Sequence, residues 1–151
     1  MKKILLLDDN PRNNSRYIKA LEKEYDVTVA LKMLSALRLL KTRIWDVVVI
    51  DVMMPTQILK EDNEMLAGFA FYEQEVRKLK LKCKVVFWSR LNESCFDTIK
   101  YPPSKGFGFV HKAEESDHLK KEIDKLWLTR QSPWQGLTKH QRYPIEKERN
   151  V

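Results

Sequence analysis

The chain has 151 residues, of which 43% are hydrophobic and 32% are charged, and its formal net charge is +7. This composition is typical of one globular domain and excludes a disordered chain, and two cysteines are too few for a disulfide-built secreted domain. The first apolar run, residues 4–7, is too short for a secretory signal, and no stretch approaches the ~18 apolar residues of a membrane span. We therefore expect a cytoplasmic protein that does not bind membranes.

Short apolar segments alternate along the chain with segments that carry apolar residues at helical spacing. The apolar segments are typical of buried parallel strands, and we predict strands over 3–7, 27–30, 47–50, 83–89 and 106–110. We predict helices over 11–24, 34–42, 67–79 and 115–128, and a short helix that begins at 92–94. Strands that alternate with helices indicate an α/β protein, a doubly wound parallel sheet of five strands with helices on both faces.

The helical periodicity stops after Trp127. Residues 129–151 include two prolines and hold five Lys/Arg against two Asp/Glu. We predict a folded domain over 1–128 and a basic C-terminal tail over 129–151 that is extended or partly disordered. Aromatic residues beside cations in this region raise the alternative of a nucleic-acid surface, but the positive charge is diffuse, so we do not expect a nucleic-acid partner.

Polar side chains follow the predicted strands at the points where the strands end. They are Asp8, Asp9, Asp51, Ser89 and Lys112. Because the carboxyl ends of parallel strands meet at one edge of the sheet, we expect these five side chains to lie together. Close carboxylates repel one another unless a cation intervenes, and carboxylate oxygens suit Mg²⁺. The sequence therefore predicts a Mg²⁺ site in which Asp9 and Asp51 bind the ion directly and Asp8 binds it through water.

Four strings carry a family resemblance: ILLLDDN at 4–10, VVVIDVMMP at 47–55, WS at 88–89 and FVHK at 109–112. In this order they resemble the response-regulator receiver (CheY-like) family, over about residues 2–128. The resemblance implies the flavodoxin-like (βα)5 fold with strand order 2-1-3-4-5. It also implies a phosphoacceptor of a two-component phosphorelay, not an enzyme beyond Mg²⁺-dependent self-phosphorylation and autodephosphorylation.

The resemblance assigns roles to individual residues. A partner histidine kinase or phosphotransfer protein would phosphorylate Asp51, and a changed surface around strands 83–89 and 106–110 would bind an unknown downstream protein. The sequence leaves the oligomeric state open, and a dimer is one of the alternatives. The other implied roles are Mg²⁺ ligation by Asp8, Asp9 and the backbone carbonyl of Met53, switching by the hydroxyl of Ser89 and the ring of Phe109, and pairing of Lys112 with the phosphoryl group.

The sequence departs from the family pattern at three places. Gly68 lies 17 positions after Asp51, about nine more than is usual, which indicates an insertion in the connection 52–66. Arg90 replaces the usual small residue and is a possible modulator that obstructs phosphodonors or pairs with Asp51. Ala113 replaces the usual proline, and a cis peptide there would cost about 2.5–4 kcal/mol.

These departures favour an alternative function, a pseudo-receiver that binds proteins without switching by phosphorylation. Simpler interpretations also exist for single residues, since Asp8 and Asp9 could only cap the first helix. A Mg²⁺-dependent hydrolase with Asp51 as nucleophile is a further alternative. The haloacid-dehalogenase pattern would need a second aspartate at position 53, which is methionine.

Overall fold

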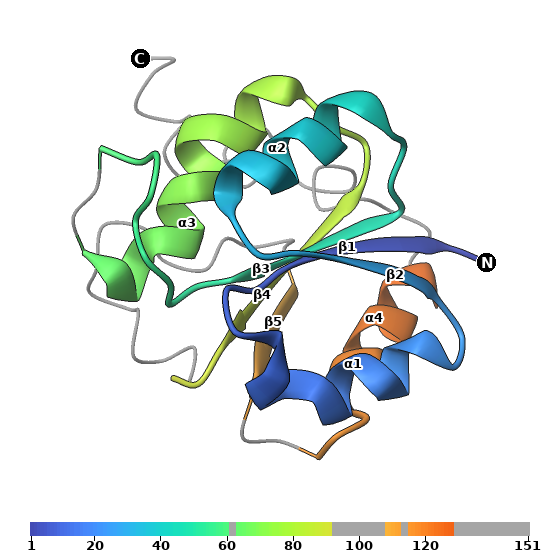
Figure 1. The fold of residues 1–151 in the computed structure, drawn as a ribbon. Coiled ribbons are helices and arrows are strands. Elements are labelled where there is room, and N and C mark those ends of the chain that lie inside the picture. The colour runs from blue at the N-terminus through green and yellow to red at the C-terminus, as the bar shows by residue number, and fades with distance from the viewer. Residues whose placement is uncertain (61–62, 92–107, 113–114, 129–151) are drawn as a thin grey trace.

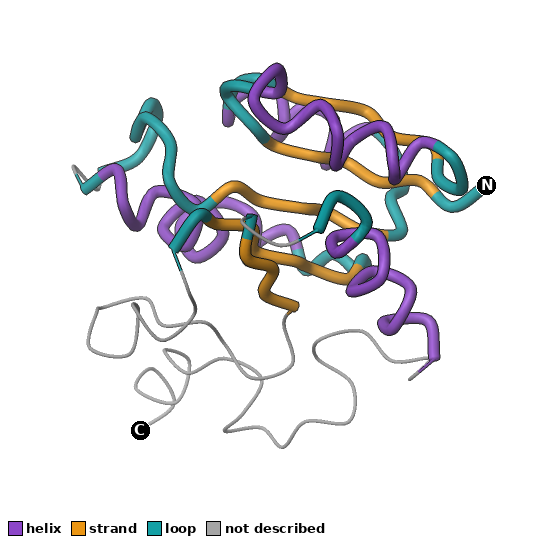
Figure 2. The backbone as a smooth tube through the Cα atoms, turned by 90° about the horizontal axis from the view of Figure 1, so that it is seen from below, coloured by secondary structure: helices purple, strands orange, loops and turns teal. Residues whose placement is uncertain are grey.

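The computed structural model describes residues 1–60, 63–91, 108–112 and 115–128. Its centre is one sheet of five parallel strands in the order β2-β1-β3-β4-β5 (Figure 2). The strands are β1 (Lys3–Leu7), β2 (Asp26–Ala30), β3 (Val47–Asp51), β4 (Lys84–Ser89) and β5 (Gly108–His111). The predicted fold class and strand order are therefore confirmed.

The helices lie on both faces of the sheet, with α2 and α3 on one side and α1 and α4 on the other (Figure 1). Their bounds are α1 (Ser15–Glu22), α2 (Met33–Thr42), α3 (Ala67–Phe71) and α4 (His118–Leu128). None of the described helices is both long and apolar enough to cross a membrane.

Three of the predicted helices differ from the structure by three or more residues at one end or in the type of helix. Residues Pro11–Asn14 form a 3-10 turn before α1, since proline lacks the N–H that later helical positions donate. The predicted helix over 67–79 is helical throughout, but after α3 it passes through a π turn at Tyr72–Val76 and a 3-10 turn at Arg77–Leu79. Helix α4 begins three residues later than predicted. The predicted short helix at 92–94, position 113 and the tail 129–151 lie outside the described residues.

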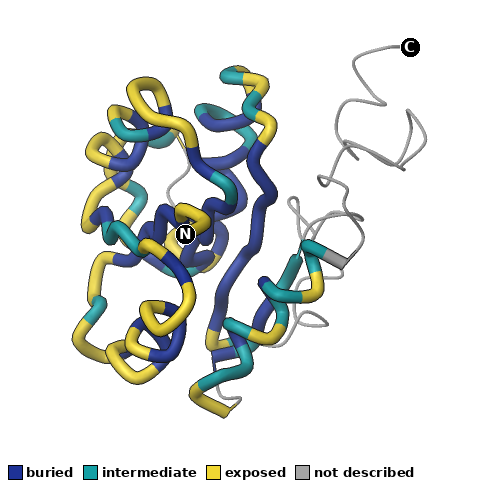
Figure 3. The backbone as a smooth tube through the Cα atoms, turned by 90° about the vertical axis from the view of Figure 1, so that its right-hand side faces the viewer, coloured by how far each residue is buried: buried dark blue, intermediate teal, exposed yellow. Residues whose placement is uncertain are grey.

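Side-chain alternation along the strands divides the core into two layers. Leu5, Leu7, Val48 and Ile50 pack with α2 and α3, whereas Ile4, Leu6, Val47 and Val49 pack with α1 and α4. All residues of β3 and β4 are buried, and exposed residues gather on the outer turns of the helices (Figure 3). Strands buried on both faces require continuous apolar runs, which is why these two segments were the clearest in the sequence.

The long connection after β3 is closed at its base and leaves the sheet intact. Met54 N–H donates to the carbonyl of Glu64 over 3.2 Å, which closes the loop at its base. The Gln57 side chain accepts from Met33 N–H over 2.7 Å, so the loop is also fixed to the first turn of α2. The extra residues therefore extend outward, and the chain returns to the sheet at α3.

Gly68 is the position at which α3 meets the end of β3. Its N–H donates to the Val52 carbonyl over 2.8 Å. A Cβ atom on Gly68 would lie 2.2 Å from the carbonyl oxygen of Asp51, which is backbone and cannot rotate away. Only glycine permits this approach, so the insertion has lengthened the loop without removing the glycine that it needs.

We predict that Gly68→Ala destabilises the protein by about 1–3 kcal/mol, because the added methyl group forces α3 away from Asp51. Urea unfolding followed by circular dichroism measures this change. The sign of the change in the free energy of unfolding is diagnostic, because a glycine-to-alanine change inside a helix ordinarily stabilises a protein by up to about 1 kcal/mol. A stabilised variant would contradict the close approach.

Tyr25 joins the turn before β2 to α4. Its hydroxyl donates to Asp124, and Trp127 Nε1 donates to the same hydroxyl over 3.1 Å. Lys120 bridges Asp124 and Glu24 at 2.9 and 3.1 Å. Burial, together with the hydrogen bond to the Asp124 carboxylate, raises the pKa of Tyr25 from 10.0 to about 12. This cluster fixes the position of α4 against α1.

The Tyr25 cluster predicts a loss of stability at alkaline pH. The folded state keeps the phenol proton at pH values where the unfolded chain releases it, so the contribution is complete below pH 10.0 and is lost as the pH rises toward about 12. Tyr25→Phe should cost about 1 kcal/mol near neutral pH, and this difference from wild type should shrink above pH 10. Urea unfolding of both proteins at a series of pH values from neutral to above 10 measures this difference in stability. A difference between wild type and Tyr25→Phe that did not change with pH would refute the prediction.

Candidate active site

Three carboxylates gather at the carboxyl edge of the sheet, where β1 and β3 end. Oxygen atoms of Asp8, Asp9 and Asp51 all lie within 4.8 Å of one another. Asp8 and Asp51 are buried, with 0% and 3% of their surface exposed, whereas Asp9 is exposed. The register that pairs Leu7 with Ile50 aligns the two strands so that they end together. The structure therefore brings together the three acids that the sequence placed at strand ends.

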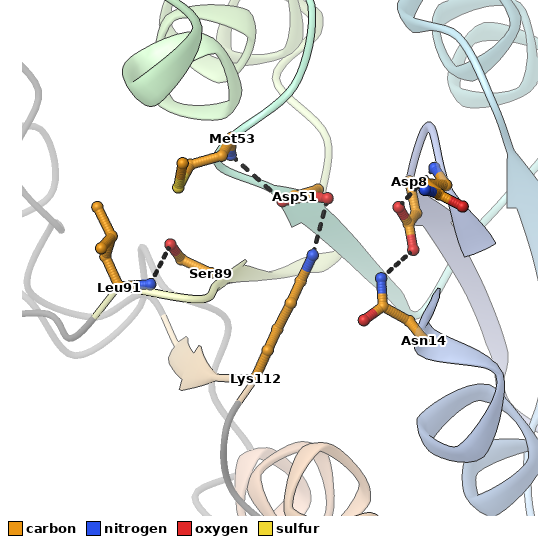
Figure 4. Close-up of polar contacts among 8 residues, drawn as sticks. Asp8, Asn14, Asp51, Met53, Ser89, Leu91 and Lys112 are labelled. Carbon is orange, nitrogen blue, oxygen red and sulfur yellow. Dashed lines mark hydrogen bonds and ion pairs between the residues drawn. The ribbon is translucent and has the colours of Figure 1, made fainter. Parts of the chain in front are cut away.

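Lys112 supplies the cation beside this cluster. Its Nζ lies 2.9 Å from Oδ2 of Asp51, and both side chains are buried (Figure 4). Its backbone N–H donates to the carbonyl of Ser89 over 2.7 Å, which fixes the lysine just after β5. The ring of Trp88 lies 4.6 Å from Nζ and packs along the same side chain. The sequence prediction that Lys112 lies near Asp51 agrees with this geometry.

Burial raises the pKa of Asp51 from 3.8 to about 6, and the nearby Asp8 carboxylate adds to the increase. The charge and hydrogen bond of Lys112, and the Met53 N–H that donates to Oδ1 over 3.2 Å, act in the opposite direction. The net increase means that one lysine does not fully offset desolvation and the neighbouring negative charge. A second cation near the acids would favour the ionised carboxylate.

Asp8 is held in a fixed orientation by two donors. The backbone N–H of Asn10 donates to Oδ1 over 3.0 Å, and Nδ2 of the buried Asn14 donates to Oδ2 over 2.8 Å (Figure 4). Sequence patterns did not predict Asn14 as a site residue. The available signal was an amide in the first helical turn after the acid pair, from which a side chain can reach back to the end of the strand.

A cleft of about 250 Å³ opens above the acids. Asn13, Met53 and Arg90 contribute to its walls beside the acids and Lys112. Arg90 is exposed and lines the cleft, but among the described residues Lys112 is the cation that is paired with Asp51. The sequence had left open whether Arg90 pairs with Asp51, and the structure places it at the rim.

The two predicted switch residues lie on β4 and β5 and are packed differently. Ser89 is fully buried at the end of β4, and its Oγ accepts from the N–H of Leu91 over 3.1 Å (Figure 4). Phe109 is half-buried on β5, pairs in register with Phe87 and packs against the α2–α3 core layer. Ser89 also accepts a hydrogen bond from Lys112 N–H at its backbone carbonyl, which places it at the strand end beside that lysine. The switching roles of the Ser89 hydroxyl and the Phe109 ring stay predictions.

The donor set fits a hard divalent ion. The three carboxylates supply several oxygen atoms on one side of a cleft that is open to water, and Mg²⁺ binds one or two carboxylates while it keeps several waters. Met53 lines the same cleft, which is consistent with its predicted role as a backbone ligand. The acidic cluster is therefore suited to hold a metal ion.

The comparison with protein families decides the classification. A family model described as the response regulator receiver domain matches residues 4–124. The chain belongs to this family. Receiver domains act in two-component systems and are generally phosphoacceptors, not enzymes. No curated protein matches the chain in a sequence search.

Solved receiver domains share the fold. The receiver domain of the Francisella response regulator 1452 is 25% identical with a TM-score of 0.64, over 87% of this chain and 100% of that one. Thermotoga maritima TrrA, solved in complex with Mg²⁺ and BeF, is 24% identical with a TM-score of 0.63, over 83% of this chain and 99% of that one. Vibrio cholerae chemotaxis protein CheY4 is 19% identical with a TM-score of 0.62, over 83% and 98%.

We predict that Asn14→Ala weakens Mg²⁺ binding to this receiver domain by about tenfold, because Asp8 loses the donor that orients it. Isothermal titration calorimetry measures the affinity. Asn13→Ala is a matched control, since Asn13 lines the same cleft but is exposed. Equal weakening in both variants, or none in either, would show that the bond from Asn14 to Asp8 does not set the affinity.

Proposed function

We propose that this receiver domain is a working phosphoacceptor, with Asp51 as the residue that takes the phosphoryl group from a histidine kinase or a phosphotransfer protein. Asp8, Asp9, Asp51 and the backbone carbonyl of Met53 would hold Mg²⁺. The observation that carries the proposal is the 2.9 Å contact between Lys112 Nζ and Asp51 Oδ2, made beside a cluster of three carboxylates. Lys112 supplies positive charge beside Asp51, and a divalent ion held by the acids would supply more, so the two would together offset the negative charge of an incoming phosphoryl group.

The chemistry is nucleophilic attack by a carboxylate. A carboxylate oxygen of Asp51 forms a bond to phosphorus, while the bond from phosphorus to the donor's histidine nitrogen breaks and that nitrogen keeps the electron pair. With its pKa at about 6, Asp51 is ionised at neutral pH and is a competent nucleophile. Bound Mg²⁺ would neutralise charge on the phosphoryl oxygens during transfer. Lys112 is positioned to pair with one of these oxygens once Asp51 is modified.

The output step would use Ser89 and Phe109. Ser89 now accepts a hydrogen bond from Leu91, and its hydroxyl hydrogen remains available to donate to a phosphoryl oxygen. Rotation of the hydroxyl toward the phosphoryl group would free space beside Phe109, which is half-buried. Phosphorylation would thus favour one of two arrangements of the surface around β4 and β5, where a downstream protein binds.

The pseudo-receiver remains the second candidate, and the position of Arg90 favours it. Arg90 is exposed and lines the same cleft as the acids, so its guanidinium would obstruct a phosphodonor or compete with a divalent ion if it turned inward. On this view the domain would bind a partner protein without accepting a phosphoryl group on Asp51. The same experiment separates the two candidates.

We predict that acetyl phosphate with Mg²⁺ labels wild-type protein and that Asp51→Asn abolishes the labelling. Mass spectrometry of the intact protein measures the added phosphoryl group. Asp46→Asn is the matched control, because Asp46 precedes the opposite end of β3, outside the cleft. Beryllofluoride, found with Mg²⁺ in the TrrA structure, should change the tryptophan fluorescence of wild type, since Trp88 lies 4.6 Å from Lys112 Nζ.

The outcomes are distinguishable. Labelling lost in Asp51→Asn and kept in Asp46→Asn supports the phosphoacceptor. Mg²⁺ binding without labelling or a fluorescence change assigns the chain to the pseudo-receivers. Labelling that persists in Asp51→Asn would place the phosphoryl group on another residue and would contradict the proposed role of Asp51.

A further inference from the structure

A second cleft lies at the opposite edge of the sheet from the acids. It has a volume of about 300 Å³ and is formed by the turn between α2 and β3 and the turn that precedes β4. In Figure 1 both turns lie at the end of the sheet at which the chain begins, far from the carboxyl ends of the strands. None of the residues that line it belongs to the proposed phosphorylation site.

The interior of this cleft is apolar and preformed. Trp45 and Cys83 are buried at its base, and Leu81 is half-buried. Trp45 Nε1 donates to the carbonyl of Leu39 over 2.9 Å, which fixes the orientation of the indole. Ile44, at the mouth, is 89% exposed, the largest value among the exposed apolar residues of the described chain. Ile44 therefore extends the apolar interior of the cleft to the protein surface, where an apolar side chain of a ligand could contact both.

Three exposed cations surround the mouth of the cleft. They are Arg43, Lys80 and Lys82, and no described carboxylate forms an ion pair with any of them. The residues that line the cleft include these three cations and no acid. The nearby carboxylate of Asp46 accepts a hydrogen bond from Lys3 N–H over 2.7 Å, and Lys78, outside the lining, pairs with Glu75 at 2.9 Å. Arg43, Lys80 and Lys82 are therefore cations at this edge whose charge no described carboxylate pairs with directly.

The backbone at Lys80 supports a role for its side chain. Lys80 ends the helical segment in the left-handed region, with φ at 52°, which is the position where helices ordinarily end in glycine. A side chain in this region is unfavourable relative to glycine. Lys80 thus places a cation at the mouth of the cleft in a backbone conformation that favours glycine.

We propose that this cleft is a docking site for an acidic peptide segment of a partner protein, one that carries a large apolar side chain between carboxylates. The apolar residue would enter the cleft against Trp45 and Ile44, and the flanking carboxylates would pair with Arg43, Lys80 and Lys82. An acidic partner matches the uncompensated charge, and an apolar anchor matches the interior. A nucleic acid fits less well, because the indole of Trp45 is buried at the base and offers no open face for base stacking. This proposal is independent of phosphorylation at Asp51.

The test uses a fluorescein-labelled peptide of about twelve residues, with a leucine–phenylalanine pair between runs of aspartate and glutamate. Fluorescence anisotropy measures its affinity for the full chain. Three comparison probes are the same peptide with serine in place of the apolar pair, a single-stranded oligothymidine of similar length, and vesicles that contain phosphatidylserine. The affinity of the acidic peptide should fall between about 0.1 M and 1 M salt, since the Debye length falls from ~10 Å to ~3 Å.

Two variants report on the two parts of the cleft. Lys80→Gly removes a cation and relieves the left-handed backbone, so it should weaken peptide binding at least threefold while leaving the melting temperature unchanged or higher. Ile44→Ser should weaken binding at least tenfold and leave the fold intact, because Ile44 is exposed. Lys19→Ala is the matched control, since Lys19 is an exposed cation on α1, on the other face of the sheet, and it should leave binding unchanged.

The proposal is supported when the acidic peptide binds, the serine version binds at least tenfold more weakly, and the Lys80 and Ile44 variants weaken binding where the Lys19 variant does not. Equal binding of the two peptides would overturn it, because the cleft would then act only as a charged surface. No binding of the acidic peptide, or tighter binding of the oligothymidine or the vesicles, would also overturn it.

Discussion

The dominant constraint on this molecule is the excess of negative charge at the carboxyl edge of the sheet. Three carboxylates lie within 4.8 Å, two of them buried, and among the described residues a single lysine forms an ion pair with the cluster. Burial of an incompletely compensated carboxylate costs folding free energy, and the raised pKa of Asp51 reflects this cost. The two continuous apolar strands β3 and β4 supply the stability that tolerates it. A divalent ion or a cationic group is the chemical complement that the edge lacks.

A backbone contact behind Asp51 explains how the long connection 52–66 is accommodated. The position of Asp51 depends on contacts made directly behind it, chiefly the hydrogen bond from Gly68 N–H to Val52 and the absence of a side chain on Gly68. The loop between them contributes few contacts to the site and is closed at its own base between Met54 and Glu64. Extra residues can enter such a loop at low entropic cost, provided that the chain returns to the same backbone contact.

Parallel alignment of the strands also separates charge along the molecule. Residues that follow strands meet at one edge, which is acidic, and residues that precede strands meet at the other, where Arg43, Lys80 and Lys82 surround an apolar cleft. The net charge of +7 gives no indication of this arrangement. A partner that carries carboxylates is repelled by one edge and attracted by the other, so the two edges are suited to different partners.

The sequence by itself determined the strand and helix order, the fold and the acids at strand ends, because buried parallel strands need uninterrupted apolar runs such as 47–50. It determined helix ends less well, since proline at position 11 and the π turn after α3 depend on local geometry that periodicity does not encode. Tertiary structure alone decided which groups act on each acid. Asn14 orients Asp8, and the cation that pairs with Asp51 is Lys112 and not Arg90. These contacts depend on distances between residues that lie up to 61 positions apart in the chain, which sequence patterns do not encode.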